Sequence, residues 1–141
     1  MGIGNAMKAS LKAGLKGVRR IAIDRERTIA FMGEEARVYA TPRLVGDVEM
    51  TCRNLLLEHV DPGEDSVGVE VGLQHLAPTL PGMTVEISVA VSAVEKRRVS
   101  FDVTVRDELE EVSRGTHTRF VVEVAKTIER LRAKAARRKP T

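Results

Sequence analysis

The amino-acid sequence predicts an α+β domain in which an antiparallel sheet covers one long helix. Residues 41–59 repeat apolar side chains every three or four positions, as a helix does, and four later segments repeat them every two positions, as strands do. The 141 residues are enough for one ordinary domain, and hydrophobic residues make up 43% of them, enough to build a core. One helix followed by consecutive strands indicates the α+β class.

The chain begins with a basic leader, residues 1–16, which we expect to be flexible and solvated because its glycines weaken a helix. A basic amphipathic helix through Met7, Leu11 and Leu15 is the alternative. Residues 18–23 are expected to form a first strand, and the charged residues 25–37 an irregular or short helical connector. The folded domain is expected to span residues 17–125, followed by a basic C-terminal helix and tail over 126–141.

The long helix is expected to run from Thr41 to His59. Thr41 can cap it with its hydroxyl, and Pro42 suits the first turn because no amide donor is needed there. The turn at residues 61–63, which contains proline and glycine, marks its end. Glu49 lies inside an apolar stripe on this helix. The stripe consists of Val45, Val48, Cys52, Leu55, Leu56 and His59.

Four strands are expected next, over residues 66–77, 84–94, 99–105 and 112–124, joined by tight turns. The first should place alternate residues on one face toward the core: Val67, Val69, Val71, Leu73 and His75. Helical spacing returns at residues 126–138. A single helix cannot cover both faces of a five-stranded sheet, so the simplest solution wraps the sheet around the helix and pairs two subunits. This element order indicates the hot-dog fold.

The distribution of charge and the composition exclude several classes of protein. Of 23 basic residues, 12 lie in the terminal segments 1–20 and 126–141, so the body between them is acidic. Nucleic-acid binding would depend on the tails alone, and we expect no nucleic-acid partner. No apolar run is long enough to cross a bilayer. A lone cysteine, Cys52, excludes an intramolecular disulfide and a multi-cysteine zinc site. It fits a reducing compartment, and we expect a cytoplasmic protein.

Glu49 is the first candidate for chemistry, because a carboxylate in an apolar stripe must be paired, hydrogen-bonded or protonated. Thr41 lies eight residues earlier, about 80° around the helix axis, so both side chains can reach one cleft. His75 is the second candidate, since a neutral imidazole can move protons near neutral pH. The structural alternatives are a surface glutamate and a hydrogen-bonded core histidine. His59 and His117 receive no role.

Other kinds of site lack their sequence signals. The glycines at 14 and 17 do not have the spacing or context of a phosphate-binding loop, and no Gly-x-Ser-x-Gly elbow is present. Three histidines in unrelated segments do not form a metal-ligand cluster. We therefore expect no metal and no cofactor.

An ordered series of short motifs over residues 18–125 resembles the fluoroacetyl-coenzyme A thioesterase family of hot-dog proteins. The motifs are Val38-Tyr39-Ala40-Thr41-Pro42, Glu49, Pro62-Gly63-Glu64, Val67-Gly68, His75-Leu76-Ala77-Pro78-Thr79, Pro81-Gly82 and Gly115-Thr116-His117-Thr118-Arg119. Two features depart from the fluoroacetyl enzyme. Pro42 stands where that enzyme has glycine, and the connector offers only Phe31 where it has an aromatic-lined lid.

The resemblance implies a homodimer with acyl-CoA sites near the subunit interface and no cofactor. It implies a catalytic trio of Thr41, Glu49 and His75, with Gly68, His75 and Arg119 contacting the substrate. The expected activity is hydrolysis of a small acyl-CoA to the free acid and CoA. A non-catalytic acyl-CoA-binding or regulatory dimer is the alternative from another class.

Overall fold

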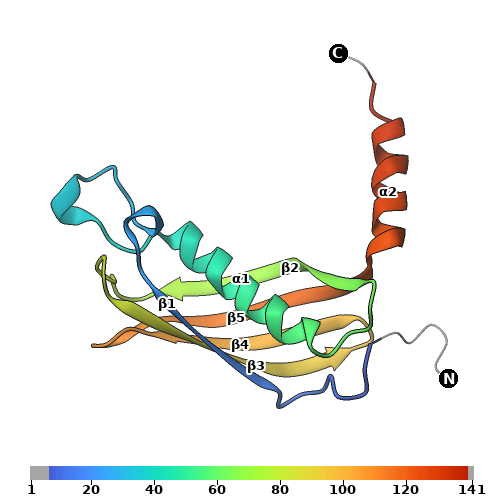
Figure 1. Cartoon of the computed structure of the whole chain (residues 1–141), viewed down its shortest axis with the longest axis horizontal. Coiled ribbons are helices and arrows are strands. Elements are labelled where there is room, and N and C mark those ends of the chain that lie inside the picture. The colour runs from blue at the N-terminus through green and yellow to red at the C-terminus, as the bar shows by residue number, and fades with distance from the viewer. Residues whose placement is uncertain (1–6, 140–141) are drawn as a thin grey trace.

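The structure, a computed structural model, describes residues 7–139 as one antiparallel sheet, one helix packed against it and one projecting helix (Figure 1). The expected order of elements is confirmed. Its members are β1 (Lys16–Ala22), α1 (Thr41–Leu57), β2 (Glu64–His75), β3 (Thr84–Glu95), β4 (Arg98–Arg106), β5 (Glu111–Glu123) and α2 (Val124–Ala136). The connector before α1 contains two short 3-10 turns, at Arg25–Arg27 and Glu34–Ala36.

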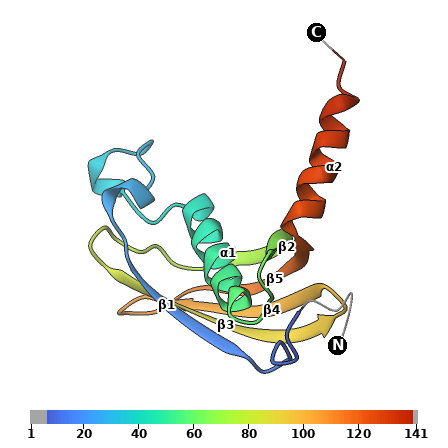
Figure 2. The same cartoon turned by 45° about the vertical axis from the view of Figure 1, so that its right-hand side comes forward.

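The five strands lie in the order β1-β3-β4-β5-β2, and every neighbouring pair is antiparallel. The strands β1 and β2, which flank α1 in the chain, therefore form the two edges of the sheet. The curved sheet wraps around α1, which crosses its inner face (Figure 2). The α+β class and the hot-dog fold are confirmed.

The core lies between α1 and the inner face of the sheet. The helix buries one side, and the central strands β3 and β4 bury every second residue, as their period predicts. Each fully buried aliphatic side chain contributes roughly 1.5–3 kcal/mol. The principal members are Leu44, Val48, Cys52, Leu55, Leu56, Val85, Ile87, Val89, Val91, Val99, Phe101, Val103 and Val105.

Strand β2 corrects the prediction of a continuous core face. Val67, Val69 and Val71 are 46%, 49% and 43% exposed, because β2 is an edge strand. A bulge between Gly68 and Glu70 also changes the register with β5. The extra residue reverses the alternation, so that Val67 lies outward, opposite Phe120. Residues beyond the bulge, His75 among them, keep the inward side expected of them.

The two ends of α1 also differ from the expectation. Ala40 is the N-cap, and Thr41 is the first helical residue, whose side chain makes no capping bond. The helix ends at Leu57, and His59 lies in the following turn with its Nδ1 2.8 Å from Ser10 Oγ. Leu11 is buried, and the Lys8 amide donates to the His59 carbonyl, so this part of the leader packs on the body rather than standing free in solvent, while residues 1–6 of the leader lie outside the described residues.

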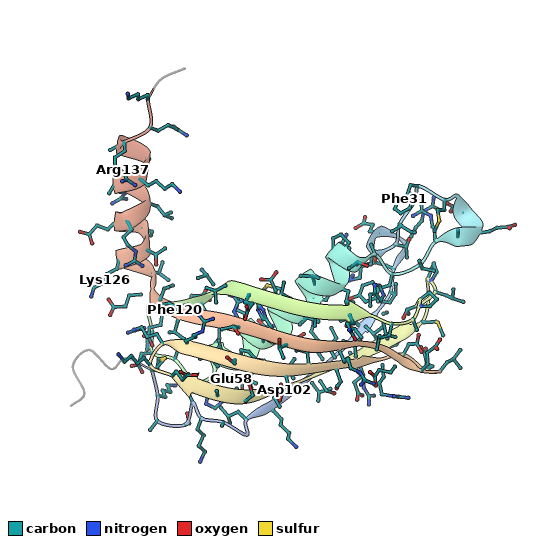
Figure 3. All side chains as sticks on the ribbon, turned by 180° about the vertical axis from the view of Figure 1, so that it is seen from behind. Phe31, Glu58, Asp102, Phe120, Lys126 and Arg137 are labelled. Carbon is teal, nitrogen blue, oxygen red and sulfur yellow. The ribbon has the colours of Figure 1, made fainter. Side chains whose placement is uncertain are left out.

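Helix α2 projects away from the sheet in both views and buries none of its side chains (Figures 1 and 2). Seen from behind, its basic residues Lys126 and Arg137 lie at the opposite end of the molecule from Phe31 on the connector (Figure 3). Among the described residues, no helix combines the length and apolar character that a bilayer crossing requires.

Candidate active site

Thr41 and His75 form a hydrogen-bonded pair where the start of α1 meets the end of β2. Their Oγ1 and Nδ1 atoms are 2.8 Å apart. Thr41 is free for this contact because it does not cap its own helix. The Nε2 atom of His75 is buried and has no hydrogen-bond partner within residues 7–139. Burial lowers the pKa of His75, so its imidazole is neutral at pH 7.

An apolar cleft of about 350 Å³ opens beside this pair. Its walls come from the connector and from the segment after β2. They comprise Ile29, Phe31, Val38, Tyr39, Leu76, Ala77 and Pro78, with Thr41 and His75 as the polar members. Phe31 is 81% exposed and stands at the rim. A larger hollow of about 540 Å³ lies along α2 between aliphatic and basic side chains, so side-chain chemistry rather than volume identifies the site.

Behind His75 lies a buried polar cluster that the sequence analysis missed. The Tyr39 ring meets the His75 ring edge-on, with centroids 6.3 Å apart. The Tyr39 hydroxyl donates to Asp47 on α1, and Arg27 Nε donates to the same carboxylate oxygen at 3.1 Å. The Tyr39 pKa is raised by burial and by this bond. Asp47 lies three residues after Leu44 and four before Thr51, and this helical spacing could have placed it on the buried side.

We expect Asp47→Ala to lower the free energy of unfolding by about 3 kcal/mol, because it leaves the Tyr39 hydroxyl and the Arg27 guanidinium without their shared acceptor. Urea denaturation measures the difference. Asp102→Ala is the matched control: this aspartate is exposed on β4 (Figure 3), and its loss should change stability by less than about 0.5 kcal/mol. Equal losses in the two variants would contradict a stabilising role for the buried cluster.

A second cluster surrounds Glu49. Its Oε2 lies 3.6 Å from Arg119 Nη1, with the Glu49 side chain 37% exposed and that of Arg119 only 6% exposed. Glu49 is therefore half-buried and paired, which is one of the states expected for a carboxylate in an apolar stripe. Ser66 fixes the other edge of Arg119, accepting from Nε and Nη2 at 2.7 Å each.

Gly68 leaves room for the Glu49 carboxylate. A Cβ at this position would lie 2.6 Å from Glu49 Oε2 and 3.2 Å from His117 Cε1. Because Gly68 lies directly opposite Arg119 on β5, it belongs to the same cluster. No larger residue fits without displacing the carboxylate.

Gly68→Ala should therefore displace the Glu49 carboxylate, and a reaction that depends on the position of this carboxylate should slow at least tenfold. The chain should still fold, since a carboxylate on a flexible side chain can move. Gly46→Ala is the matched control, because nothing lies within 4 Å of a Cβ there. Turnover assays with melting curves on both variants test this, and an unchanged rate in Gly68→Ala would argue against a role for the carboxylate's position.

The single chain thus groups the predicted residues in two places. Thr41 and His75 lie together at the cleft, and Glu49, Gly68 and Arg119 lie together about two helical turns away, roughly 12 Å along α1. The cleft beside Thr41 does not include Glu49 among its lining residues. His117, to which the sequence analysis assigned no role, belongs to the second group: its Nε2 lies 3.2 Å from Arg119 Nη1.

Cys52 does not supply a nucleophile. It is buried in the core, and burial raises its pKa to about 12, so the unreactive thiol form predominates at neutral pH. The candidate reactive groups are the Thr41 hydroxyl, the His75 imidazole and the Glu49 carboxylate.

Comparisons with known proteins point to one family. The sequence profile described as fluoroacetyl-CoA-specific thioesterase matches residues 23–125. The fluoroacetyl-CoA thioesterase of Streptantibioticus cattleyicolor is 30% identical over 135 residues, which are 91% of this chain and 97% of that protein.

Solved structures agree. A fluoroacetyl-CoA thioesterase structure superposes with a TM-score of 0.81 at 29% identity, covering 88% of this chain and 97% of the other. A thioesterase-superfamily member of Thermus thermophilus gives a TM-score of 0.81 at 29% identity, covering 89% and 93%. A hot-dog-like protein of Thermanaerovibrio acidaminovorans, 22% identical with a TM-score of 0.80 over 86% and 91% of the two chains, shares the fold. The chain belongs to the fluoroacetyl-CoA-specific thioesterase family of hot-dog proteins.

Proposed function

We propose that this protein is an acyl-CoA thioesterase that hydrolyses a small acyl-CoA to the free acid and CoA. The observation that carries the proposal is the neutral Thr41–His75 pair in the wall of an apolar cleft. The cleft offers apolar side chains to an acyl group and one polar pair to the thioester. Family membership supports the same chemistry, since the relatives named above include a fluoroacetyl-CoA thioesterase.

In this mechanism the Thr41 hydroxyl donates to Nδ1 of His75, which leaves the imidazole proton on Nε2. That N–H donates to the thioester carbonyl oxygen and stabilises the negative charge that develops there. Glu49 either attacks the carbonyl carbon directly or removes a proton from an attacking water. When Glu49 takes the proton of water, the hydroxide adds to the carbonyl carbon, the carbon–sulfur bond breaks, and the Glu49 carboxyl returns its proton to the CoA thiolate. When Glu49 attacks directly, the carbon–sulfur bond breaks to leave a mixed anhydride on Glu49, the thiolate takes a proton from solvent, and water then hydrolyses the anhydride to the free acid and regenerates the carboxylate.

We also propose that the site is completed in a homodimer. Three observations support this: β2 is an open sheet edge, its valines are exposed, and one chain keeps Glu49 apart from His75. Gly68 and His75 both lie on β2. If two β2 edges pair antiparallel about an axis between Val71 and Gly72, Gly68 lies opposite His75 of the partner subunit. Each active site then combines Glu49 of one chain with Thr41 and His75 of the other.

Mixing two inactive variants tests this arrangement. When Glu49→Gln and His75→Ala chains are refolded together at random, about half of the dimers contain one chain of each kind. Each mixed dimer has one intact composite site out of two, so the mixture should recover about a quarter of the wild-type rate. A site contained within one chain predicts no recovery. Sedimentation of the wild-type protein provides the control, because a monomer would rule out the composite site.

Release of free thiol from a panel of acetyl-, fluoroacetyl-, propionyl- and butyryl-CoA tests the proposed activity. Hydrolysis of at least one member is the expected result, and the fastest member identifies the preferred acyl group. Tight binding without thiol release would instead support a regulatory acyl-CoA-binding dimer. We place the reaction in the cytoplasm, which the lone thiol of Cys52 suits and which cell fractionation can test.

A further inference from the structure

Two nitrogens of the Arg119 guanidinium are bonded to Ser66, and the third faces Glu49. Ser66 occupies Nε with its hydroxyl and Nη2 with its carbonyl, both at 2.7 Å. Only Nη1 remains to face Glu49, and the same nitrogen lies 3.2 Å from Nε2 of His117. Because arginine carries donors alone, this last contact requires an acceptor on the histidine.

The contacts of His117 define which of its nitrogens carries the proton. Its Nδ1 lies 2.8 Å from the Glu70 carbonyl oxygen, in the bulge of β2, and only an N–H can bond a carbonyl. The proton is therefore on Nδ1, and the Nε2 lone pair accepts from Arg119. The ring is 1% exposed and stacks on Phe101, with centroids 6.4 Å apart, so it cannot turn to exchange these partners.

The charges around His117 keep it neutral. A protonated ring would direct a second N–H at the Arg119 guanidinium and place two positive charges in contact. Burial, in the first place, and Arg119 lower the pKa of His117, against the raising effects of the Glu70 carbonyl and of Glu49 on α1. These effects leave the imidazole uncharged at neutral pH and able to accept the bond from Arg119.

We propose that His117 is a positioning residue. Its neutral Nδ1–H form holds the Arg119 guanidinium so that the Glu49 carboxylate is paired with it by charge but makes no direct hydrogen bond to it. The separation of 3.6 Å between Glu49 Oε2 and Arg119 Nη1 is longer than a direct charged hydrogen bond. The carboxylate is oriented by charge, and its oxygens remain available to water or to a thioester. This role rests on the proposed function, in which Glu49 is the reacting group.

Two amide substitutions separate the two contacts of His117. In His117→Gln the side-chain oxygen can accept from Arg119 in place of Nε2, and in His117→Asn the shorter amide can donate to the Glu70 carbonyl in place of Nδ1. We expect His117→Asn to lower kcat roughly tenfold to a hundredfold, the cost of a misplaced reacting group, with KM changing much less. His117→Gln should recover kcat to within about threefold of the wild type. His59→Gln, in the turn after α1, should leave kcat unchanged.

The kinetic part of the experiment measures thiol release from the acyl-CoA panel. Melting temperatures are measured alongside, because substitution of a purely structural histidine would lower stability without a difference in kcat between His117→Asn and His117→Gln. Equal loss of kcat in the two amide variants, or no loss in either, overturns the proposal. A second arm needs no substrate: ¹⁵N resonances of the free wild-type protein should show His117 protonated at Nδ1 at pH 7. The Nε2–H form or a charged ring would overturn the positioning role. If no panel member is hydrolysed but this form is observed, the proposed activity fails while the His117–Arg119 contact stands.

Discussion

Glu49→Gln should lower the rate of thiol release by roughly a hundredfold or more, the usual scale for removing an acid–base group or nucleophile. The amide keeps the size of the side chain and can still meet Arg119, but it can neither attack the thioester nor take a proton from water. The Arg119 side chain is only 6% exposed, so loss of its charged partner should lower stability, and melting curves accompany the assay to show that the variant is folded at the assay temperature.

The matched control for this prediction is Glu58→Gln, a change of the same chemistry at the end of the same helix. Glu58 is the C-cap of α1 and is exposed, so its amide should leave both rate and melting temperature unchanged. The comparison is made by steady-state assay at saturating substrate. A near-wild-type rate in Glu49→Gln would remove this carboxylate from the mechanism.

His75→Ala should also lower the rate by roughly a hundredfold or more, because it removes the N–H donor expected to polarise the thioester. It also leaves the Thr41 hydroxyl without its partner. Thr41→Val should reproduce part of this loss, since the imidazole would no longer be oriented, while Thr41→Ser should retain most of the activity. His59→Ala is the control, because His59 lies outside both clusters. A fully active His75→Ala variant would contradict the mechanism.

The pH dependence follows from the buried position of His75. Burial lowers its pKa below the ordinary value of 6.5, so the neutral form that accepts from Thr41 persists into mildly acidic solution. Activity should therefore be constant above pH 6.5 and fall as the pH drops through the lowered pKa. Stability should fall at slightly higher pH, as the pH drops from about 6.5 toward the lowered pKa, because the unfolded chain binds this proton at higher pH than the folded chain does. His75→Ala should weaken this acid dependence of stability, as measured by urea denaturation between pH 5 and 7.

Most of the fold was predictable because local periodicity reflects burial. The alternate valines of β3 and β4 and the turn at residues 61–63 identified their elements, and those predictions are confirmed. Strand β2 was assigned correctly as a strand but with the wrong burial, since its valines have the same local pattern whether the strand is central or at the edge. The bulge at Gly68 was not predictable from spacing, because its register depends on β5.

Part of the candidate site was likewise predictable from the sequence, and part of it was not. Thr41, Glu49 and His75 were recognisable as polar groups in apolar contexts and through a family resemblance. Asp47 and His117 were missed, since an aspartate on a helix and a histidine in a strand usually face solvent. Their burial depends on Tyr39, Arg27 and Arg119, which approach from other parts of the chain.

By itself, the sequence determined the α+β class, the order of its elements and the residue types available for thioester chemistry, because helical hydrogen bonding, turn formation and apolar periodicity act over a few neighbouring residues. The tertiary structure alone decided that Thr41 bonds to His75 instead of capping its helix. It also decided that Glu49, two turns of α1 after Thr41, pairs with Arg119. Such contacts depend on the register of strands distant in the chain, and a shift of one residue turns a side chain to the opposite face of the sheet.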